Sequence, residues 1–175
     1  MKLASYSGTR PGIAGLANIA IRARLRGQFS HSEIVFEPGD GVGYLMPDGT
    51  LEPDANGALW CASSTASERL PSISMRRAGS IGGVRLKRIV LDPARWVLRP
   101  VNADPLHAAL WAIDHEGMPY DWQLIMGYVA WMIPQSAGGV DCSEACAEML
   151  QMPDPWRFDP CSLEAAASWA NTLRP

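Results

Sequence analysis

The stretch GGVDCSEACAEML, from Gly138 to Leu150, places a cysteine directly after an aspartate, where an apolar-periodic segment begins. Asp141 is a favourable N-cap, and Glu144 three positions later completes the pattern of a capping box. The spacing therefore predicts a helix that starts at Cys142. Free backbone N–H groups and the helix dipole would then favour a thiolate and stabilise an oxyanion. Packing is the alternative role for this thiol, and it is the expected role of Cys146 one turn later.

The segments around this helix predict a mixture of strands and helices. Apolar residues at helical spacing, caps and stop signals predict helices over 13–26, 105–116, 120–133, 142–150 and 162–173, the last with Ser162 as N-cap. Short apolar or alternating runs predict strands over 34–36, 57–64 and 83–92. This order favours an α+β fold, with a small antiparallel β-sheet packed with helices. At this length, we expect one domain over residues 1–175.

Composition limits the classes of function. The apolar fraction is 47% with seven tryptophans, which supports a real core. A net charge of −3 argues against a nucleic-acid partner. The longest apolar run, from Leu124 to Pro134, is too short to span a bilayer, so we expect no integral membrane segment. The start MKLASYSGTRPG lacks the apolar run of a secretory leader, and the four cysteines lack close paired spacing. We therefore expect a cytoplasmic protein with free thiols.

A nucleophilic cysteine usually needs a base, and the chain has three histidines. His107 and His115 fall within the helix predicted after Asp104, and we expect them at the surface or at an interface. His31 follows GQFS and begins a strand, which is a rigid position from which a ring can reach a helix N-terminus. His31 is therefore the candidate base, and a histidine satisfied within the core is the alternative.

Two motifs in this order resemble a known superfamily. FSHSEIVF near the start and DCSEACAEML near the end are similar to the circularly permuted NlpC-type papain-like cysteine hydrolases, the YiiX-like group. GMPYDW resembles the Gly-x-x-Tyr-Asp helix entry of that group, and GGVRLKRI after CASS is similar to its small phage- and prophage-encoded members. The resemblance runs from about Tyr6 to the final helix. It implies a permuted papain-like order of elements and a phage or prophage origin.

The resemblance also implies roles for individual residues. Cys142 would be the nucleophile and His31 the general base. In this group the residue that orients the imidazole comes from the next strand, here LWCASS, which offers only hydroxyls, and we expect Ser64 to take that role. Glu52 and Asp48 are loop alternatives. The residues expected to line the substrate site are Glu33, Tyr6, Asp141 and Ser143; Glu33 could also hydrogen-bond the ring.

The function expected from these residues is a thiol hydrolase of amide or ester bonds without a cofactor. The resemblance points to peptidoglycan peptides as substrate; lipid acyl hydrolysis or acyl transfer is the second alternative, and a non-catalytic binding module on the same fold is the third. A zinc site made of Cys142, Cys146 and His31, with Cys161, is less favoured, because structural zinc sites use closer cysteine pairs in loops. No metal is therefore predicted, and the sequence leaves the oligomeric state open.

Overall fold

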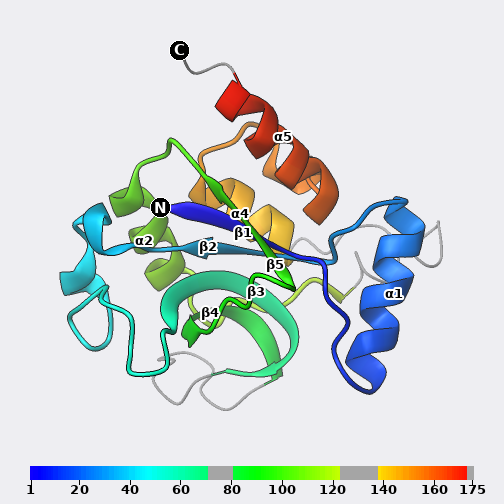
Figure 1. The fold of residues 1–175 in the computed structure, drawn as a ribbon, viewed down its shortest axis with the longest axis horizontal. Helices are drawn as coiled ribbons and strands as arrows, with labels where there is room; N and C mark the ends of the chain where they lie inside the picture. Colours follow the sequence, from blue (N-terminus) through cyan, green and yellow to red (C-terminus); the bar gives the residue numbers. More distant parts are fainter. Residues whose placement is uncertain (71–80, 123–137, 173–175) are drawn as a thin grey trace.

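The computed structural model describes residues 1–70, 81–122 and 138–172, and within these ranges the protein has an α+β fold (Figure 1). The strands are β1 (Lys2–Tyr6), β2 (His31–Val35), β3 (Leu59–Arg69), β4 (Ile81–Ile89) and β5 (Trp96–Pro100). The α-helices are α1 (Ile13–Leu25), α2 (Pro105–Asp114), α4 (Cys142–Met149) and α5 (Pro160–Thr172). Short 3-10 turns lie at Pro38–Asp40, Gly43–Leu45 and Pro155–Arg157.

The described strands form one sheet in the order β4-β3-β2-β1-β5, and every neighbouring pair is antiparallel. The predicted α+β class with an antiparallel sheet is therefore confirmed. The prediction of only three strands was wrong, because β1 and β5 were missed. Strand β1 lies inside the sheet and is buried at four consecutive positions, so it lacks the apolar–polar alternation of a half-exposed strand. Strand β5 follows a turn at Asp92–Arg95, where the chain was expected to leave the sheet at Pro93.

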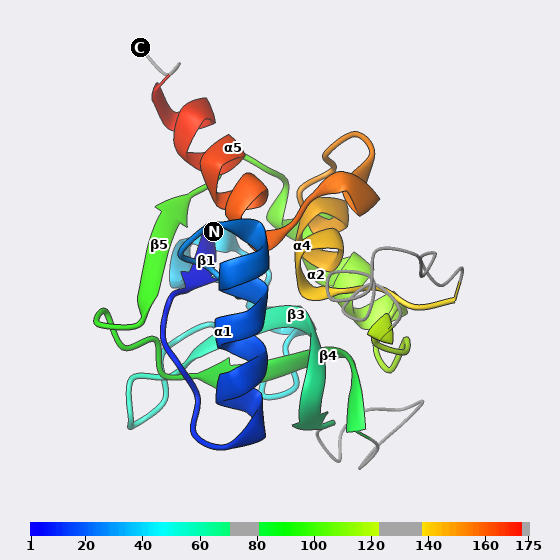
Figure 2. The ribbon, with the colours of Figure 1, turned by 90° about the vertical axis from the view of Figure 1, so that its right-hand side faces the viewer.

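Helices α2, α4 and α5 cover one face of the sheet, and α1 stands at its end (Figures 1 and 2). The main core lies between these three helices and the strands. Its largest fully buried apolar side chains are Leu3, Ile34, Phe36, Val84, Met149 and Leu163. A smaller cluster forms a second core from Ala4, Tyr6, Val35, Cys61 and Trp96. Because side chains alternate along a strand, these two clusters lie on opposite faces of the sheet.

Aspartate side chains begin three of the helices. Asp104 accepts a hydrogen bond from the backbone N–H of Leu106 at the start of α2, and Asp141 caps α4. The predicted Ser162 cap of the last helix was wrong. Asp159 accepts from the backbone N–H groups two and three residues later, so α5 begins two residues before Ser162. A carboxylate accepts two such bonds more strongly than a hydroxyl does.

The helix predicted over 120–133 lies mostly outside the described residues. Its first residue, Tyr120, forms a parallel bridge with Val140 and so brings the chain beside the start of α4. Within the described ranges, no helix combines the length and the apolar character needed to cross a membrane.

Candidate active site

His31, the first residue of β2, is held by a buried carboxylate on its own strand. Its Nε2 lies 2.8 Å from Oε1 of Glu33, two residues along the chain. The guanidinium of Arg85 on β4 grips both oxygens of Glu33, and Nη1 donates to Oε2 at 2.7 Å. Glu33 and Arg85 are both fully buried, and the His31 ring is only one-tenth exposed. The imidazole therefore sits at the end of a chain of fixed polar contacts.

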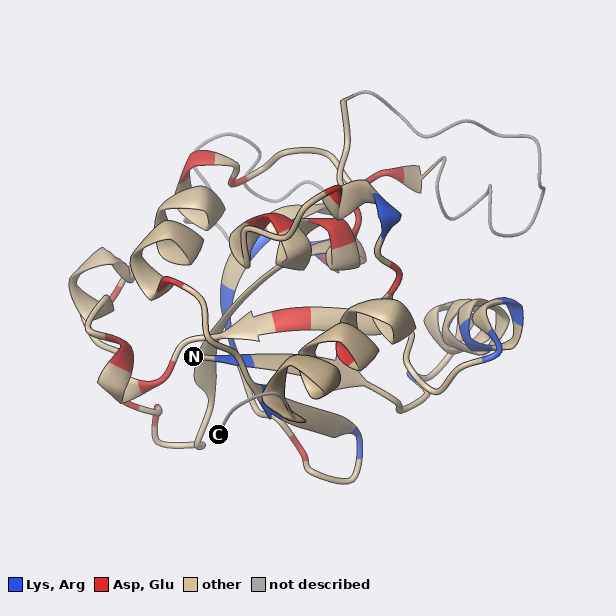
Figure 3. Cartoon of the chain, turned by 90° about the horizontal axis from the view of Figure 1, so that it is seen from above, with Lys and Arg blue, Asp and Glu red and all other residues tan. Residues whose placement is uncertain are grey.

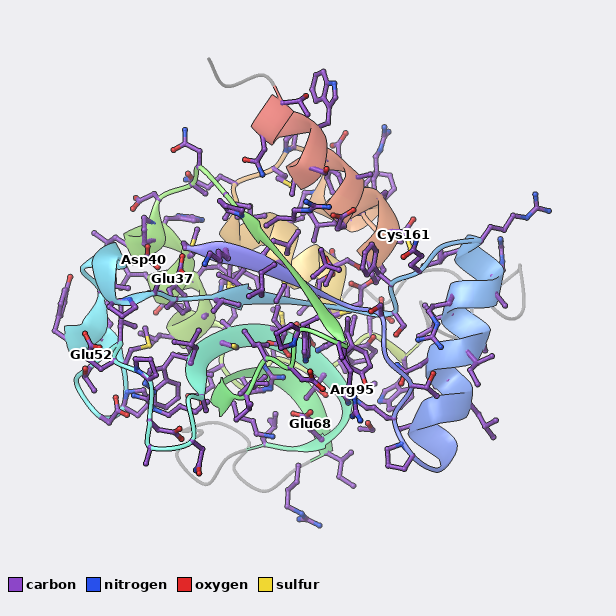
Figure 4. The ribbon with its side chains drawn as sticks, viewed as in Figure 1. Glu37, Asp40, Glu52, Glu68, Arg95 and Cys161 are labelled. Carbon is purple, nitrogen blue, oxygen red and sulfur yellow. The ribbon has the colours of Figure 1, made fainter. Side chains whose placement is uncertain are left out.

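This chain carries charge. Burial alone would raise the pKa of Glu33, but the Arg85 guanidinium and the His31 ring lower it to about 2. Burial would lower the pKa of Arg85, yet the facing carboxylates raise it above its ordinary value. Glu68 lies at the end of β3 (Figure 4) and extends the network, since its Oε2 lies 3.4 Å from Nε of Arg85. The carboxylate on His31 is thus ionised, and it can stabilise an imidazolium.

The prediction that Ser64 orients the ring was wrong. Ile34 pairs with Ala62 in the β2–β3 register, so Ser64, two residues further, projects toward the same face as Ile34. His31 and Glu33 project from the other face of β2. The Ser64 hydroxyl is buried, and among the described residues it has no hydrogen-bond partner. The spacing of two residues along one strand is what brings Glu33 to the ring.

Neither loop alternative for this role bonds the His31 ring, whose Nε2 is paired with Glu33. Asp48 accepts hydrogen bonds from Arg88 and from the indole N–H of Trp60, and these contacts lower its pKa although desolvation opposes them. Glu52 is exposed.

Cys142 is the first residue of α4, as predicted. Asp141 accepts hydrogen bonds from the backbone N–H groups of Ser143 and Glu144 and from the Ser143 hydroxyl. Cys142 is 4% exposed. The cap therefore occupies two of the amides that were expected to serve an oxyanion.

The prediction of a resting thiolate was wrong. Burial raises the pKa of Cys142, and the neighbouring Asp141 raises it further. Hydrogen bonds from the backbone N–H groups of Ser32 and Ser143 act in the opposite direction but do not reverse the shift. A helix N-terminus lowers a thiol pKa only while solvation and nearby charges permit it. In the resting site Cys142 is a neutral thiol.

The thiol and the imidazole line two adjoining hollows. A cleft of about 240 Å³ lies between α1, the ends of β2 and β3, and the segment at Tyr120. Its lining residues are Arg10, Ala14, Ala17, Asn18, Ile21, Ser30, His31, Thr65, Ala66, Ser67, Tyr120 and Trp122. A much smaller hollow is lined by Cys142 and by Ile21, Ser30, Tyr120, Asp141, Ser143 and Pro160. The two meet at Ile21, Ser30 and Tyr120, which line both.

Two glycines of β4 make room for one wall of the cleft. A Cβ on Gly83 would lie 2.5 Å from the carbonyl oxygen of Met118, and a Cβ on Gly82 would lie 3.4 Å from Cβ of Tyr120. Both glycines have positive φ angles, which other residues rarely adopt. The chain at 118–120 can therefore lie directly against the end of β4, and Tyr120 reaches the rim shared by the two hollows.

Cys142 and His31 are neighbours without a direct bond. The backbone N–H of Ser32, the residue that follows His31 in β2, donates a hydrogen bond to the Cys142 sulfur. Within the described part of the chain, no hydrogen bond joins Sγ to the imidazole, whose Nε2 is paired with Glu33. The two predicted segments lie beside each other in the fold, and the resting site is not a thiolate–imidazolium pair.

The four residues expected to line the substrate site divide into two pairs. Asp141 and Ser143 line the small hollow, although both are buried and bonded to each other. Glu33 and Tyr6 line neither hollow, and both are buried, so neither is placed to meet a ligand in these hollows. Tyr6 instead packs on Trp96, with ring centroids 4.9 Å apart.

Arg85 is a polar site residue that the sequence did not lead us to expect, and Thr65 was expected only among the hydroxyls that could orient His31. Arg85 stands between two buried apolar residues in β4, and an arginine in such a strand signals a buried partner. Thr65 lies in the strand stretch that supplied Ser64, one position further, on the face that carries His31. The buried apolar neighbours of Arg85 signal that it has a buried partner, but they do not identify Glu33 as that partner.

The remaining histidines and cysteines line neither of the two hollows. His115 stacks on Trp111, and burial raises the pKa of Cys61 and of Cys146. Cys161 is partly exposed at the first turn of α5, beside the end of α1 (Figure 4). Within the ranges that the structure describes, no group of three or more His, Cys, Asp or Glu side chains could hold a metal ion.

A larger hollow of about 360 Å³ lies between β5, the end of α4 and α5. Its lining is mostly apolar, with the amides of Asn102 and Asn171 and no titratable side chain. The candidate site is therefore the smaller cleft at His31, where ionisable groups converge.

The chain matches no protein-family model, no curated protein sequence and no solved structure.

Proposed function

We propose that the protein is a thiol hydrolase of amide or ester bonds, with Cys142 as nucleophile and His31 as general base. The observation that carries the proposal is the ionised Glu33 carboxylate on His31, beside a cleft that adjoins the hollow of Cys142. A base oriented by a carboxylate and placed beside a nucleophile is the arrangement used for acyl transfer.

The chemistry follows from the protonation states. Because Cys142 rests as a neutral thiol, the imidazole must take its proton as the sulfur attacks the carbonyl carbon. His31 then delivers that proton to the departing amine or alcohol, which leaves a thioester on Cys142. Water attacks the thioester and passes a proton to His31, the C–S bond breaks, and His31 returns that proton to the sulfur, so that the acid and the free thiol are released. In these steps Nε2 stays on Glu33, and Nδ1 is the ring nitrogen that Glu33 leaves available to carry the proton.

Glu33 and Arg85 act in this proposal as positioning residues. Arg85 keeps Glu33 ionised, and Glu33 stabilises the imidazolium that each proton transfer creates. Because both lie outside the cleft, Glu33→Gln should lower kcat while leaving KM unchanged. A purely structural role would lower the apparent kcat only through a smaller fraction of folded, active protein, so kcat is calculated per active site after titration of Cys142. A kcat per active site equal to that of wild type would contradict the positioning role.

The substrate proposed is a short peptide of the peptidoglycan type, and a permuted papain-like order of elements is part of the same proposal. Both rest on the resemblance of the His31 and Cys142 motifs. The test is hydrolysis of a peptidoglycan peptide by wild type, Cys142→Ala and His31→Ala, followed by chromatography of the products. Turnover by wild type and its loss in both variants is expected, and equal product from all three proteins would contradict the proposal.

A binding module without catalysis is the second candidate. It is favoured by the burial of the Cys142 thiol and by its raised pKa. Such a module would bind the same peptide with equal affinity in wild type and in both variants, and none of the three would release product.

A further inference from the structure

We infer that the cleft at His31 binds the carboxylate of a ligand, held between the guanidinium of Arg10 and the hydroxyl of Thr65. The inference deepens the proposed function by naming a substrate class, an acyl compound that carries a free carboxylate next to an apolar group. It rests on that function for the reaction and on the cleft itself for the binding.

The first observation is a hydroxyl without a partner. Thr65 lines the cleft and is 1% exposed, and within the described chain its Oγ1 has no hydrogen-bond partner. A buried hydroxyl left unpaired costs free energy that a ligand oxygen in the cleft would recover. Thr65 faces Gly83 across the β3–β4 register, so no side chain of β4 supplies that partner.

The second observation is the sign of the charge at the cleft. Of the residues that line it in the described structure, Arg10 alone is permanently charged, and neither aspartate nor glutamate is among them. Arg10 belongs to the network that surrounds Glu33. Its ion-paired members are three cations, Arg10, Arg85 and Lys87, and two carboxylates, Glu33 and Glu68, which leaves one positive charge.

Arg10 is the member of that network placed to meet a ligand. Its Nη2 lies 3.4 Å from Glu68, at the outer limit of a hydrogen bond, and its guanidinium stacks over the Tyr6 ring at 5.6 Å. Arg85, by contrast, is fully buried and committed to Glu33. The neighbouring helix α1 carries arginines and no acidic residue, so nothing on that wall repels an anion (Figure 3).

The rest of the cleft is apolar. Ile21 and the alanines of α1 form one wall, and Tyr120 with the half-exposed Trp122 forms the other. The rings of Tyr120 and Trp122 meet edge to face, with centroids 5.6 Å apart. These surfaces suit an apolar or aromatic group beside the carboxylate.

The experiment compares two probes of equal shape, N-acetylphenylalanine and its neutral amide, titrated into the protein by NMR. Wild type should bind the acid about tenfold more tightly than the amide, because an arginine–carboxylate hydrogen bond is charge-assisted. Arg10→Gln should remove this preference. Equal affinity of wild type for both probes would overturn the inference.

Thr65→Val tests the hydroxyl without changing the shape of the side chain. It should weaken binding of the acid about threefold to tenfold and leave the melting temperature unchanged or higher, since it removes an unpaired polar group. The control is Ser64→Ala, which removes an unpaired hydroxyl that lines neither hollow and should leave binding unchanged. Unchanged binding in Thr65→Val would show that Oγ1 meets only ordered water, and it would overturn the role of Thr65.

The same titrations in Cys142→Ala measure binding in a protein that lacks the proposed nucleophile. Together with the turnover of wild type, they separate this inference from the proposed function. Preference for the acid, without turnover of any peptide by wild type, would retain the carboxylate site and remove the hydrolase. Turnover by wild type without preference for the acid would do the reverse.

Discussion

The two halves of the candidate site solve the problem of burial in opposite ways. At His31 a buried carboxylate keeps its charge, because Arg85 grips both of its oxygens. At Cys142 the thiol stays neutral, because it is buried and Asp141 places a negative charge beside the sulfur. Asp141 also accepts hydrogen bonds from the helix amides that could otherwise stabilise a thiolate. A position at a helix N-terminus therefore does not by itself make a thiolate; the capping residue and the solvation of the sulfur decide its charge.

Because the thiol is neutral, proton transfer depends on the imidazole of His31, and removal of this ring should have the largest effect on turnover. His31→Ala should reduce turnover by about 100-fold or more, the lower range for general-base catalysis. The measurement is the initial rate of product release at saturating substrate. His107→Ala, on α2 and outside both hollows, is the matched control and should keep the wild-type rate. A His31→Ala rate equal to that of the control would place the base elsewhere.

The charged half should also be the more sensitive to the loss of one partner. Glu33→Gln leaves the buried Arg85 guanidinium facing a neutral amide and should lower the free energy of unfolding by about 3–5 kcal/mol. Urea denaturation gives this value. The double variant Glu33→Leu with Arg85→Met removes both charges and should lose less than Glu33→Gln alone. A decrease of less than about 1 kcal/mol in the free energy of unfolding for Glu33→Gln would mean that water reaches the Glu33–Arg85 pair.

Acid should weaken the same half. The pKa of Glu33 is lowered from 4.5 to about 2 in the folded protein, so its contribution to stability is complete above pH 4.5 and is lost as the pH falls toward 2. A shift of this size corresponds to about 3 kcal/mol. The stability advantage of wild type over Glu33→Gln should therefore be constant near neutrality and shrink across that window. An advantage that does not change between pH 5 and pH 2 would contradict the ionised carboxylate.

The neutral half predicts a slow thiol. Cys161 is partly exposed, whereas Cys142 is buried beside a carboxylate, so brief iodoacetamide treatment at pH 7 should label Cys161 about tenfold faster or more. Mass-spectrometric peptide mapping measures both. This order is the reverse of the one expected from the helix dipole alone. Faster labelling of Cys142 would restore the resting thiolate.

The smallest effect should come from Ser64. Its hydroxyl has no partner among the described residues and projects away from the His31 side of the sheet. Ser64→Ala should leave turnover unchanged and alter the free energy of unfolding by less than about 1 kcal/mol. A rate loss comparable to that of His31→Ala would mean that the ring changes partner during the reaction.

Local signals in the sequence predicted much of the fold. The Asp141 cap, the strand that begins at His31 and the helix after Asp104 were all found, because capping and short-range periodicity depend on neighbouring residues. Strands β1 and β5 were missed, since their pairing partners lie far away in the chain. Sequence patterns show the face of a strand more readily than its partners.

For the same reason, the sequence predicted which two segments lie together at the candidate site but not which residue orients the His31 ring. The segments of His31 and Cys142 do adjoin, but the orienting group was sought on the next strand, where this chain has only hydroxyls. Glu33 was expected to line the substrate site, with a hydrogen bond to the ring as a further possibility; its place two residues from His31 on the same face of the strand is why it reaches the ring. Arg85, 52 positions away in the chain, stabilises the buried carboxylate of Glu33, and no local sequence pattern predicts that these two residues pair.

The most direct test of the account is to trap the covalent intermediate. Wild type and His31→Ala would be mixed with 4-nitrophenyl acetate, quenched in acid within seconds, digested and mapped by mass spectrometry. The account predicts an acetyl group on Cys142 in wild type, formed about 100-fold more slowly in His31→Ala. Acetylation of Cys142 at equal rates in the two proteins, or acetylation confined to Cys161, would contradict it.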